Sequence, residues 1–495
     1  MRGFAKKVQD VLASRRFYWL ALGFLVFEGL WIAFSALYPM AFDEDFHVGI
    51  IRIYSEQWLP FLAGQPENAN QFGALATDPS YLYHYLMSFP YRLVSLVTDS
   101  QAAHVIVLRI LNVAMVAAGV MAFRQVLLRA GISRAFTHAA ILLFALVPTV
   151  PLLAGQVNYD NLMFLALAGV CWLVLMIVEQ LRARMLNLQT YALLALLLMS
   201  ACLVKYPFLP IALTAAVFVA FMLWRAFRGG GFGKALAKSY AKLPRRRALA
   251  LLALLIIGSV LFLQRYGYNL AVYHQPVPDC AAVLSVEACM EYGPWGRNYR
   301  YEASKPADFA PDMGSYAWLW LQGLHYRMFF MITGPPQHTN YPPALLPSAT
   351  AVVILVFGLA ALLFYWRRSL GGQPFLVFLL AVTVVYAAAL FFLNNYPQYV
   401  ETGRPVAING RYFIPLLLPM AAVFGRALSA AFRSIQLKAV AAVLAIVLFL
   451  QGGGVFSFIL RSDPAWYWPN QAVVDGNTAA QKALDNVMFI GPKEY

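Results

Sequence analysis

Three consecutive acidic residues follow the first long apolar segment of the chain. They are Asp43, Glu44 and Asp45, and His47 comes shortly after them. At least one of three carboxylates so close together is expected to have a perturbed pKa. In a helix Asp43 and His47 would share a face, so the group could supply a general base or bind hydroxyl groups. The alternative is a hydrated acidic turn at a helix N-terminus, where the helix dipole favours negative charge.

A second acidic site lies in the short segment Gly-Gln-Val-Asn-Tyr-Asp-Asn at 155–161, between two apolar runs. Its carboxylate is Asp160, and the amides of Asn158 and Asn161 flank it. This combination suits a polar ligand. A helix-capping aspartate at the start of the next apolar run is an equally good interpretation.

Cationic residues at the ends of apolar runs provide the complementary charge. Lys205 closes one run just before Tyr-Pro, and Arg411 and Tyr412 open another within Asn-Gly-Arg-Tyr-Phe-Ile-Pro at 409–415. An ammonium or guanidinium group at this depth can bind a lipid phosphate, although snorkelling to the membrane interface explains such residues equally well. His325 and Arg327, in a loop rich in Trp and Tyr, are weaker candidates for the same anion.

The composition decides what kind of protein must position these residues. Of 495 residues, 61% are hydrophobic and only 12% are charged, and the mean hydropathy is +0.64. These values exclude an ordinary soluble enzyme and a disordered chain. The net charge of +15 does not indicate a nucleic-acid partner, because membrane proteins collect basic residues on one side. We therefore expect an all-α polytopic membrane protein in contact with lipids.

About eleven apolar runs are long enough to cross the roughly 30 Å of hydrocarbon in a bilayer. They are predicted near 18–38, 102–126, 136–153, 161–181, 188–204, 208–225, 248–264, 346–366, 373–393, 412–428 and 438–460. The first is read as a retained helix and not as a cleaved signal peptide.

The basic residues predict the orientation of these spans. If the N-terminus is cytoplasmic and the sides alternate, most of the 37 Lys and Arg residues fall inside, whereas of the 22 acids only Asp10 and Glu179 do. This is the positive-inside pattern. Asp43, Asp160, Lys205 and Arg411 then all lie at the outer face.

The predicted organisation is a membrane module over 1–460 and a short outer tail over 461–495. Two long outer loops, 39–101 and 265–345, belong to the module, and the first is expected to contain amphipathic surface helices. Cys280 and Cys289 lie in the second loop and either form a disulfide or remain free thiols. Since no nucleotide-binding loop is seen on the inner side, any chemistry is expected at the outer face.

In this order the elements resemble the GT-C superfamily of membrane glycosyltransferases, which use polyprenyl-phosphate-linked sugars. The resemblance rests on the Asp43-Glu44 pair after the first span, Asp160 between the third and fourth spans, Lys205 before Tyr-Pro, and the run at 409–415. Protein O-mannosyltransferases and lipid A aminoarabinose transferases share the first two elements. The chain departs from them in its third acid, Asp45, in its short tail and in its cysteine-bearing loop.

The resemblance implies an inverting transfer of a sugar from a polyprenyl-phosphate donor to a hydroxyl group of a glycan, glycolipid or protein. It implies a catalytic role for Asp43, as the general base, and for Asp160. Glu44, Asp45 and His47 would bind the acceptor or the sugar. Lys205, Arg411, Tyr412, His325 and Arg327 would bind the donor phosphate. No cofactor is assigned, and the use of a divalent cation such as Mg²⁺ or Mn²⁺ stays open.

Two other functions remain as alternatives. A lipid-linked sugar transporter or flippase would spread ionisable residues through its spans, and here they gather at one face. A non-catalytic scaffold of an envelope-assembly complex would tolerate the loss of Asp43 or Asp160. For the glycosyltransferase we expect a bacterial cytoplasmic membrane, with cell-envelope glycan or glycolipid synthesis as the setting.

Overall fold

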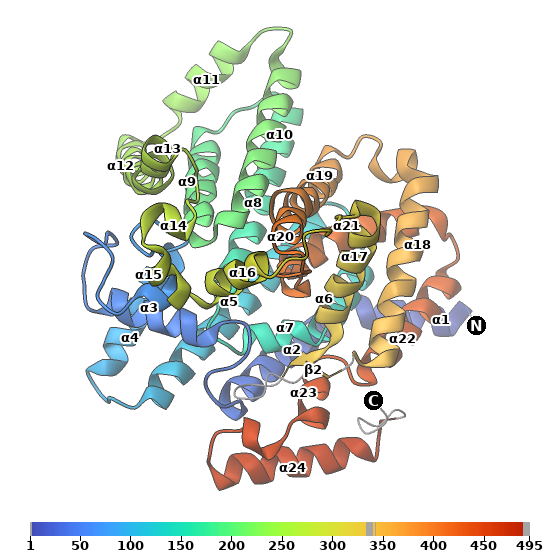
Figure 1. Cartoon of the computed structure of the whole chain (residues 1–495). Helices are drawn as coiled ribbons and strands as arrows, with labels where there is room; N and C mark the ends of the chain where they lie inside the picture. The colour runs from blue at the N-terminus through green and yellow to red at the C-terminus, as the bar shows by residue number, and fades with distance from the viewer. Residues whose placement is uncertain (1, 333–339, 342, 489–495) are drawn as a thin grey trace.

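The computed structural model describes residues 2–332, 340–341 and 343–488. Within them the chain is helical except for one pair of antiparallel two-residue strands, β1 (Met331–Ile332) and β2 (Asn340–Tyr341). Nine helical segments in this part of the chain are long and apolar enough to span a membrane, and two shorter apolar helices accompany them (Figure 1). Together they coincide with the runs predicted from sequence.

The long segments are built from α2 (Arg15–Ser35), α5 (Gln101–Arg129), α8 (Tyr159–Arg182), α10 (Leu209–Phe227), α12 (Arg245–Phe262), α18 (Leu345–Leu370), α19 (Pro374–Ala389), α21 (Ile414–Ala431) and α22 (Ile435–Leu450). The two shorter helices are α6 (Arg134–Ala145) and α9 (Leu188–Val204). Single π-helical turns, Leu263–Gly267 and Leu390–Asn395, continue α12 into α13 (Tyr268–Tyr273) and α19 into α20 (Tyr396–Thr402).

The run predicted over 136–153 is divided into two helices. After α6 ends at Ala145, the chain turns, and the short buried helix α7 (Thr149–Ala154) begins after Pro148. Proline lacks the N–H that a continuing helix needs, and it disfavours helical geometry in the residue before it. The break brings the segment at 155–161 back into the bundle interior.

The last run is also divided. Between α22 and α23 (Val455–Arg461) the chain turns through glycines, with positive φ at Gly452 and Gly454. A Cβ on Gly454 would lie on the Glu28 carboxylate, whose Oε1 accepts the backbone N–H of Val455 at 2.8 Å. Only glycine fits this close approach. The buried Glu28 thus bonds the turn after α22.

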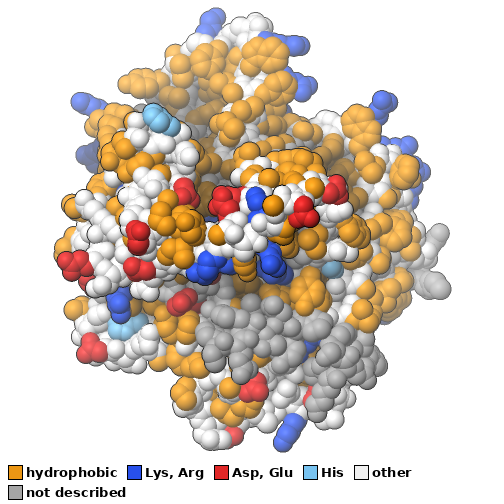
Figure 2. Space-filling view, viewed as in Figure 1, with side chains coloured by type: hydrophobic (Ala, Val, Ile, Leu, Met, Phe, Trp, Pro, Cys, Tyr) orange, Lys and Arg blue, Asp and Glu red, His pale blue; other side chains and the backbone are white. Residues whose placement is uncertain are grey.

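Residues predicted for the cytoplasmic side contact one another at one end of the bundle. Arg129 pairs with Glu179 at 3.4 Å, and His138 bonds the carbonyl of Leu12 in α1 (Arg2–Ala13). The loop helix α11 (Phe232–Ala241) lies beside α9. In Figure 2, Lys and Arg side chains project from the rim beside α11 and α18, and others lie at the centre of the face that is shown.

The other end carries the predicted surface helices. They are α3 (Glu44–Ser55) and α4 (Leu82–Ser95), which pack on each other, with a 3-10 turn at Asn70–Phe72 between them. On α3, Val48, Ile51 and Tyr54 are buried. This is the apolar face that the helical spacing predicted.

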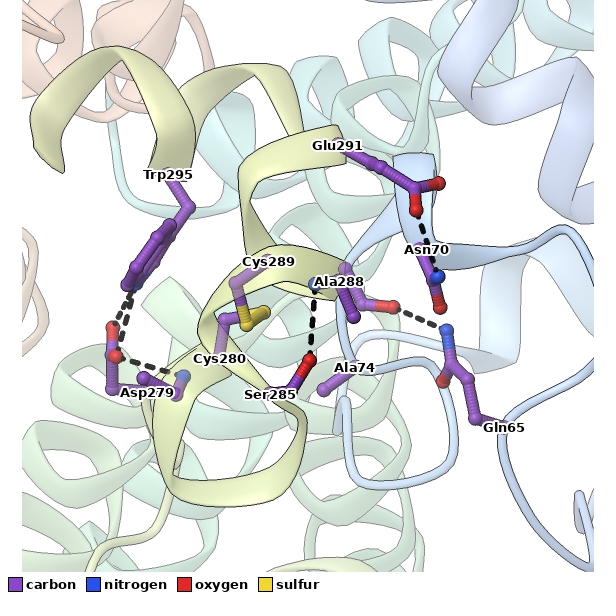
Figure 3. The surroundings of a disulfide bond; sticks show 12 residues. Gln65, Asn70, Ala74, Asp279, Cys280, Ser285, Ala288, Cys289, Glu291 and Trp295 are labelled. Atoms are coloured by element: carbon purple, nitrogen blue, oxygen red, sulfur yellow. Dashed lines mark hydrogen bonds between the residues drawn. A yellow bond between two sulfur atoms is a disulfide. The ribbon is translucent and has the colours of Figure 1, made fainter. Parts of the chain in front are cut away.

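The loop over 265–345 folds into short helices that cover this end: α14 (Cys280–Val283), α15 (Val286–Glu291), α16 (Gly293–Ala303) and α17 (Met313–Phe329). Cys280 and Cys289 form a disulfide (Figure 3). Close to it, Asn70 donates to Glu291 at 3.1 Å, which ties the second long loop to the first.

The tail packs on the end of α2. It contains a 3-10 turn at Pro464–Trp466 and the helix α24 (Gln471–Asp485). Trp31 donates to Asn477 at 2.9 Å, and Asn477 donates to Ser35 at 3.1 Å. The tail therefore lies at the same end of the bundle as the start of the first long loop, as the alternating topology requires.

Candidate active site

The chain is held in an unusual backbone conformation just before α3. Phe42 and Asp43 both have positive φ, of 67° and 69°. Such a conformation is costly for residues other than glycine and persists only where the surroundings enforce it. Here the Phe42 carbonyl accepts hydrogen bonds from Asn158 at 3.1 Å and from Arg411 at 3.0 Å. The turn thereby fixes where the Asp43 side chain points.

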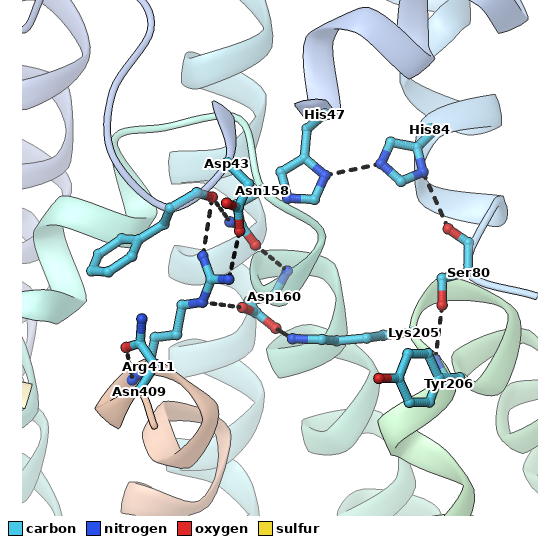
Figure 4. A network of polar contacts seen from close by, with 11 residues as sticks. Asp43, His47, Ser80, His84, Asn158, Asp160, Lys205, Tyr206, Asn409 and Arg411 are labelled. Carbon is cyan, nitrogen blue, oxygen red and sulfur yellow. Dashed lines mark hydrogen bonds and ion pairs between the residues drawn. The ribbon is translucent and has the colours of Figure 1, made fainter. Parts of the chain in front are cut away.

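Asp43 is the accessible carboxylate of the site. Its side chain is 57% exposed, and its Oδ2 accepts a 2.8 Å hydrogen bond from Arg411 Nη2, whose own side chain is only 7% exposed (Figure 4). Desolvation by the surrounding protein raises the pKa of Asp43, but the charge and hydrogen bond of Arg411, with smaller effects of Lys205 and Arg297, outweigh it. The net pKa of Asp43 is below its usual value, so the group is ionised at neutral pH.

Asp160 lies between two cations in the interior. Its Oδ1 pairs with Lys205 Nζ, and its Oδ2 lies 3.9 Å from Arg411 Nε. Both Asp160 Oδ2 and Arg411 Nε are buried without a hydrogen-bond partner. The cap of α8 is Asn158, whose side chain accepts the N–H of Asp160 at 2.9 Å. The capping interpretation of Asp160 is therefore wrong, and its carboxylate instead faces Lys205 and Arg411.

Lys205 is held where α9 ends and a 3-10 turn (Tyr206–Phe208) begins. Its side chain is 3% exposed. Its ammonium lies 4.4 Å from the centre of the Tyr159 ring and 4.8 Å from that of Tyr412. Two aromatic faces and one carboxylate thus hold a cation that does not reach to solvent as a snorkelling lysine would.

Arg411 is positioned by close packing. It belongs to a 3-10 turn (Gly410–Phe413) that begins when Asn409 accepts the Arg411 N–H at 3.0 Å. A Cβ on Gly410 would meet the Leu324 carbonyl oxygen at 2.5 Å, so only glycine lets this turn lie against α17.

Glu44 occupies a different environment from Asp43. It is fully buried and accepts two hydrogen bonds from Arg109, at 2.8 and 2.6 Å. The backbone N–H groups of Met40 and Val157 donate to it at 2.8 and 3.0 Å. With each oxygen bound twice and neither exposed, the geometry argues against the acceptor-binding role predicted for Glu44 and favours a structural one.

His47 is buried on α3 beside the ion pairs. Its Nδ1 lies 2.9 Å from Nε2 of His84, and the edge of Tyr159 packs on it with ring centres 4.5 Å apart. Burial, followed by the charges of His84, Arg411 and Lys205, holds the pKa of His47 well below its usual value. His47 is therefore neutral at the edge of the site.

Three other predicted residues are not joined to these ion pairs. Asp45 is exposed, and within the described residues it forms no hydrogen bond or ion pair. His325 lies 2.8 Å from the Ser348 hydroxyl, toward α18, and desolvation lowers its pKa. Arg327 is exposed, and its pKa is lowered by desolvation although the nearby Tyr412 opposes the shift.

Some residues of the site lay outside the sequence predictions. They are Ser80 and His84, in and beside α4, and Arg109 of α5. A buried arginine in an apolar run signals that a carboxylate must be near. Nothing in the linear sequence shows that this carboxylate is Glu44.

Within the described residues, no group of three or more His, Cys, Asp or Glu side chains is placed to hold a metal ion. Asp43 and Asp160 instead face the cations Arg411 and Lys205.

Comparisons with known proteins find likeness only in structure. No protein-family model matches the chain, and no curated protein matches it. The structure is similar to the oligosaccharyltransferase of Archaeoglobus fulgidus, solved tethered by a disulfide bond to an acceptor peptide that contains the NVT sequon. That match has 14% identity and a TM-score of 0.45, and covers 97% of this chain and 60% of the other.

The apo form of the same oligosaccharyltransferase matches with a TM-score of 0.34 and 14% identity, over 89% of this chain and 59% of the other. The chain thus spans about three fifths of the length of the solved structures that it matches.

Proposed function

We propose that this chain is a GT-C-type glycosyltransferase that moves a sugar from a polyprenyl-phosphate donor to an acceptor hydroxyl group. One observation carries the proposal. An exposed, ionised carboxylate, Asp43, pairs with the buried Arg411 at one end of a bundle of apolar helices, and Asp160 links Arg411 to a second buried cation, Lys205. In this proposal the base for a hydroxyl group lies beside the cations that would bind the donor phosphate.

In the proposed reaction the acceptor oxygen attacks the anomeric carbon as the bond from that carbon to the phosphate oxygen breaks. The hydroxyl proton passes to the Asp43 carboxylate. The electron pair of the broken bond stays with the phosphate, and Arg411 and Lys205 stabilise the charge that develops there. Attack opposite to the leaving group inverts the anomeric carbon.

Asp160 has a supporting role in this proposal. Two cations side by side would repel each other, and the Asp160 carboxylate lies between them. Since Arg411 also binds Asp43, a donor phosphate that competes for the guanidinium would weaken the Asp43–Arg411 pair. The pKa of Asp43 would then rise toward its usual value, and its carboxylate would become a better base.

The residues do not fit a divalent cation. Two carboxylates and two basic side chains already balance in charge, and each carboxylate faces a cation. A doubly charged ion would have to displace Arg411 or Lys205, so we derive no step through a metal.

For the setting we propose the outer face of a bacterial cytoplasmic membrane, in cell-envelope glycan or glycolipid synthesis. The distribution of basic residues supports this orientation. The disulfide between Cys280 and Cys289 fits an oxidising compartment.

The test is transfer by the purified protein in liposomes that contain radiolabelled polyprenyl-phosphate sugars, with a crude envelope fraction as acceptor. We expect transfer by the wild type and by Asp45→Asn, and loss of transfer by Asp43→Asn. Asp45→Asn removes the same charge two residues away, where no ion pair exists. Equal transfer by all three proteins would contradict the proposal. So would donor binding without turnover, which a transporter or scaffold would show.

A further inference from the structure

A series of hydrogen bonds leads from Ser80, just before α4, to the edge of the site. The backbone carbonyl of Ser80 lies 3.1 Å from Nδ1 of His84. Nε2 of His84 lies 2.9 Å from Nδ1 of His47 (Figure 4). Both imidazoles are 1% exposed, and the two rings stack with centres 5.2 Å apart. Ser80 also contacts the segment that carries Lys205, because its hydroxyl accepts the Tyr206 N–H at 3.0 Å.

The direction of these hydrogen bonds fixes the proton on His84. A carbonyl oxygen only accepts, so Nδ1 of His84 must carry the hydrogen that bonds Ser80. Burial lowers the pKa of His84 to about 3, so the ring is neutral and holds a single N–H. Its Nε2 is then a bare acceptor.

The same reasoning fixes the proton on His47. Because Nε2 of His84 has no hydrogen, Nδ1 of His47 must donate to it, and the neutral His47 ring has a bare Nε2. Within the described residues, Nε2 of His47 forms no hydrogen bond. In Figure 4 this nitrogen points away from His84, toward the side where Asp43 and Asp160 lie.

We propose that His47 Nε2 is a fixed hydrogen-bond acceptor for a hydroxyl group of the substrate, and that His84 is a positioning residue that sets the proton position through Ser80. The inference rests on the proposed function, since it assigns the group that this site recognises. A bare imidazole nitrogen attracts a hydroxyl hydrogen and repels a phosphate oxygen. His47 therefore complements Arg411 and Lys205, which bind the anion.

The proton positions can be tested without any substrate. The protein is labelled with ¹⁵N-histidine, reconstituted in liposomes and measured by nuclear magnetic resonance at neutral pH, with His47→Gln and His84→Gln to assign the signals. For both rings we expect Nδ1 coupled to a directly bonded hydrogen and Nε2 without one. A protonated Nε2 on His47, or an imidazolium on either residue, would overturn the proposal.

The role in recognition is tested by two matched variants of His84. The amide oxygen of His84→Gln can still accept from His47 Nδ1, whereas His84→Leu has a similar volume and no acceptor. We expect His84→Leu to raise KM for the sugar donor or the acceptor about tenfold, the loss typical of one hydrogen bond, with kcat changed less. His84→Gln should restore most of the effect. Equal KM values for folded His84→Leu and the wild type would overturn the proposal.

A second pair of variants keeps the test decisive if His84→Leu does not fold. His47→Gln places an amide near the Nε2 position, and His47→Leu does not. His47→Leu should raise the same KM while His47→Gln retains most of the affinity, and equal KM values would overturn the role. If the wild type transfers no sugar at all, the proposed function fails, while the resonance measurement still decides the proton positions.

Discussion

Asp43 and Glu44 are neighbours in sequence, yet the fold gives them opposite environments. Glu44 is fully buried and receives four hydrogen bonds, two of them from Arg109. Asp43 is 57% exposed and binds one arginine. A carboxylate with all its oxygens satisfied can only stabilise the structure, whereas one with free acceptor positions beside two cations can take part in a reaction. Within one acidic motif, Glu44 therefore stabilises the fold and Asp43 is available for a reaction.

The backbone explains how adjacent side chains diverge. Helix α3 begins at Glu44, so Glu44 projects from its first turn into the bundle toward Arg109 of α5. Asp43 precedes the helix with positive φ and is turned toward Arg411, which comes from a segment 368 residues later. The strained turn at Phe42 and Asp43 is thus what places one acid inside and the other at the surface.

The largest loss of stability is expected from a substitution at Glu44. Glu44→Gln leaves the buried Arg109 without its partner, and we expect the free energy of unfolding to fall by about 3–5 kcal/mol. Thermal unfolding in detergent would measure this as a lower Tm. Glu56→Gln, at an exposed position one residue beyond α3, is the control. Asp43→Asn should lower Tm much less, since Asp43 is half exposed, Arg411 keeps Asp160 nearby and asparagine tolerates positive φ well. A Tm loss for Asp43→Asn as large as that for Glu44→Gln would refute the distinction.

The next largest effect, on catalysis, is expected from a substitution at Lys205. Lys205→Met removes one of the two cations that would stabilise the leaving phosphate, so we expect kcat/KM to fall about 100- to 1,000-fold. The fall should lie mainly in kcat, because the charge grows as the bond breaks. Lys482→Met, on exposed α24, serves as the control. An unchanged kcat in the folded Lys205→Met protein would remove the residue from the proposed reaction.

The ionisation of Asp43 gives a smaller effect that a pH profile can detect. Its pKa is lowered mainly by Arg411, so the carboxylate is charged throughout the neutral range and activity is lost only as pH falls through that pKa. We expect kcat/KM to decline on the acid side only at a pH below the range in which an ordinary aspartate titrates. Arg411→Gln should shift the residual acid limb to higher pH. An acid limb near neutrality in the wild type would point to a different base.

The smallest effect is expected from metal removal. Because Asp43 and Asp160 face cations and not vacant oxygen-rich sites, treatment with a chelator should change the transfer rate less than about twofold. The control is the same protein with the chelator saturated by added Mg²⁺. A rate that collapses on chelation and returns with Mg²⁺ or Mn²⁺ would show that the ion pairs rearrange around a metal.

The sequence alone determined the membrane-embedded helical architecture and which charges gather at one end of it. Spans can be predicted from local sequence alone, because any run of about twenty apolar residues can cross a bilayer. The predicted runs therefore match the observed segments. The same holds for Asp43, Asp160, Lys205 and Arg411: each adjoins an apolar run, and alternation of the runs places all four at the same end.

Which of these charged side chains pair with one another depends on the tertiary structure. The pairing of Arg109 with Glu44, of Lys205 with Asp160 and of His47 with His84 joins segments far apart in sequence. The positive φ at Asp43 could not be predicted from the sequence either, because the residue is not a glycine. Such features depend on how helices and turns from distant parts of the sequence pack together. A buried charge then pairs with whichever opposite charge that packing brings within reach.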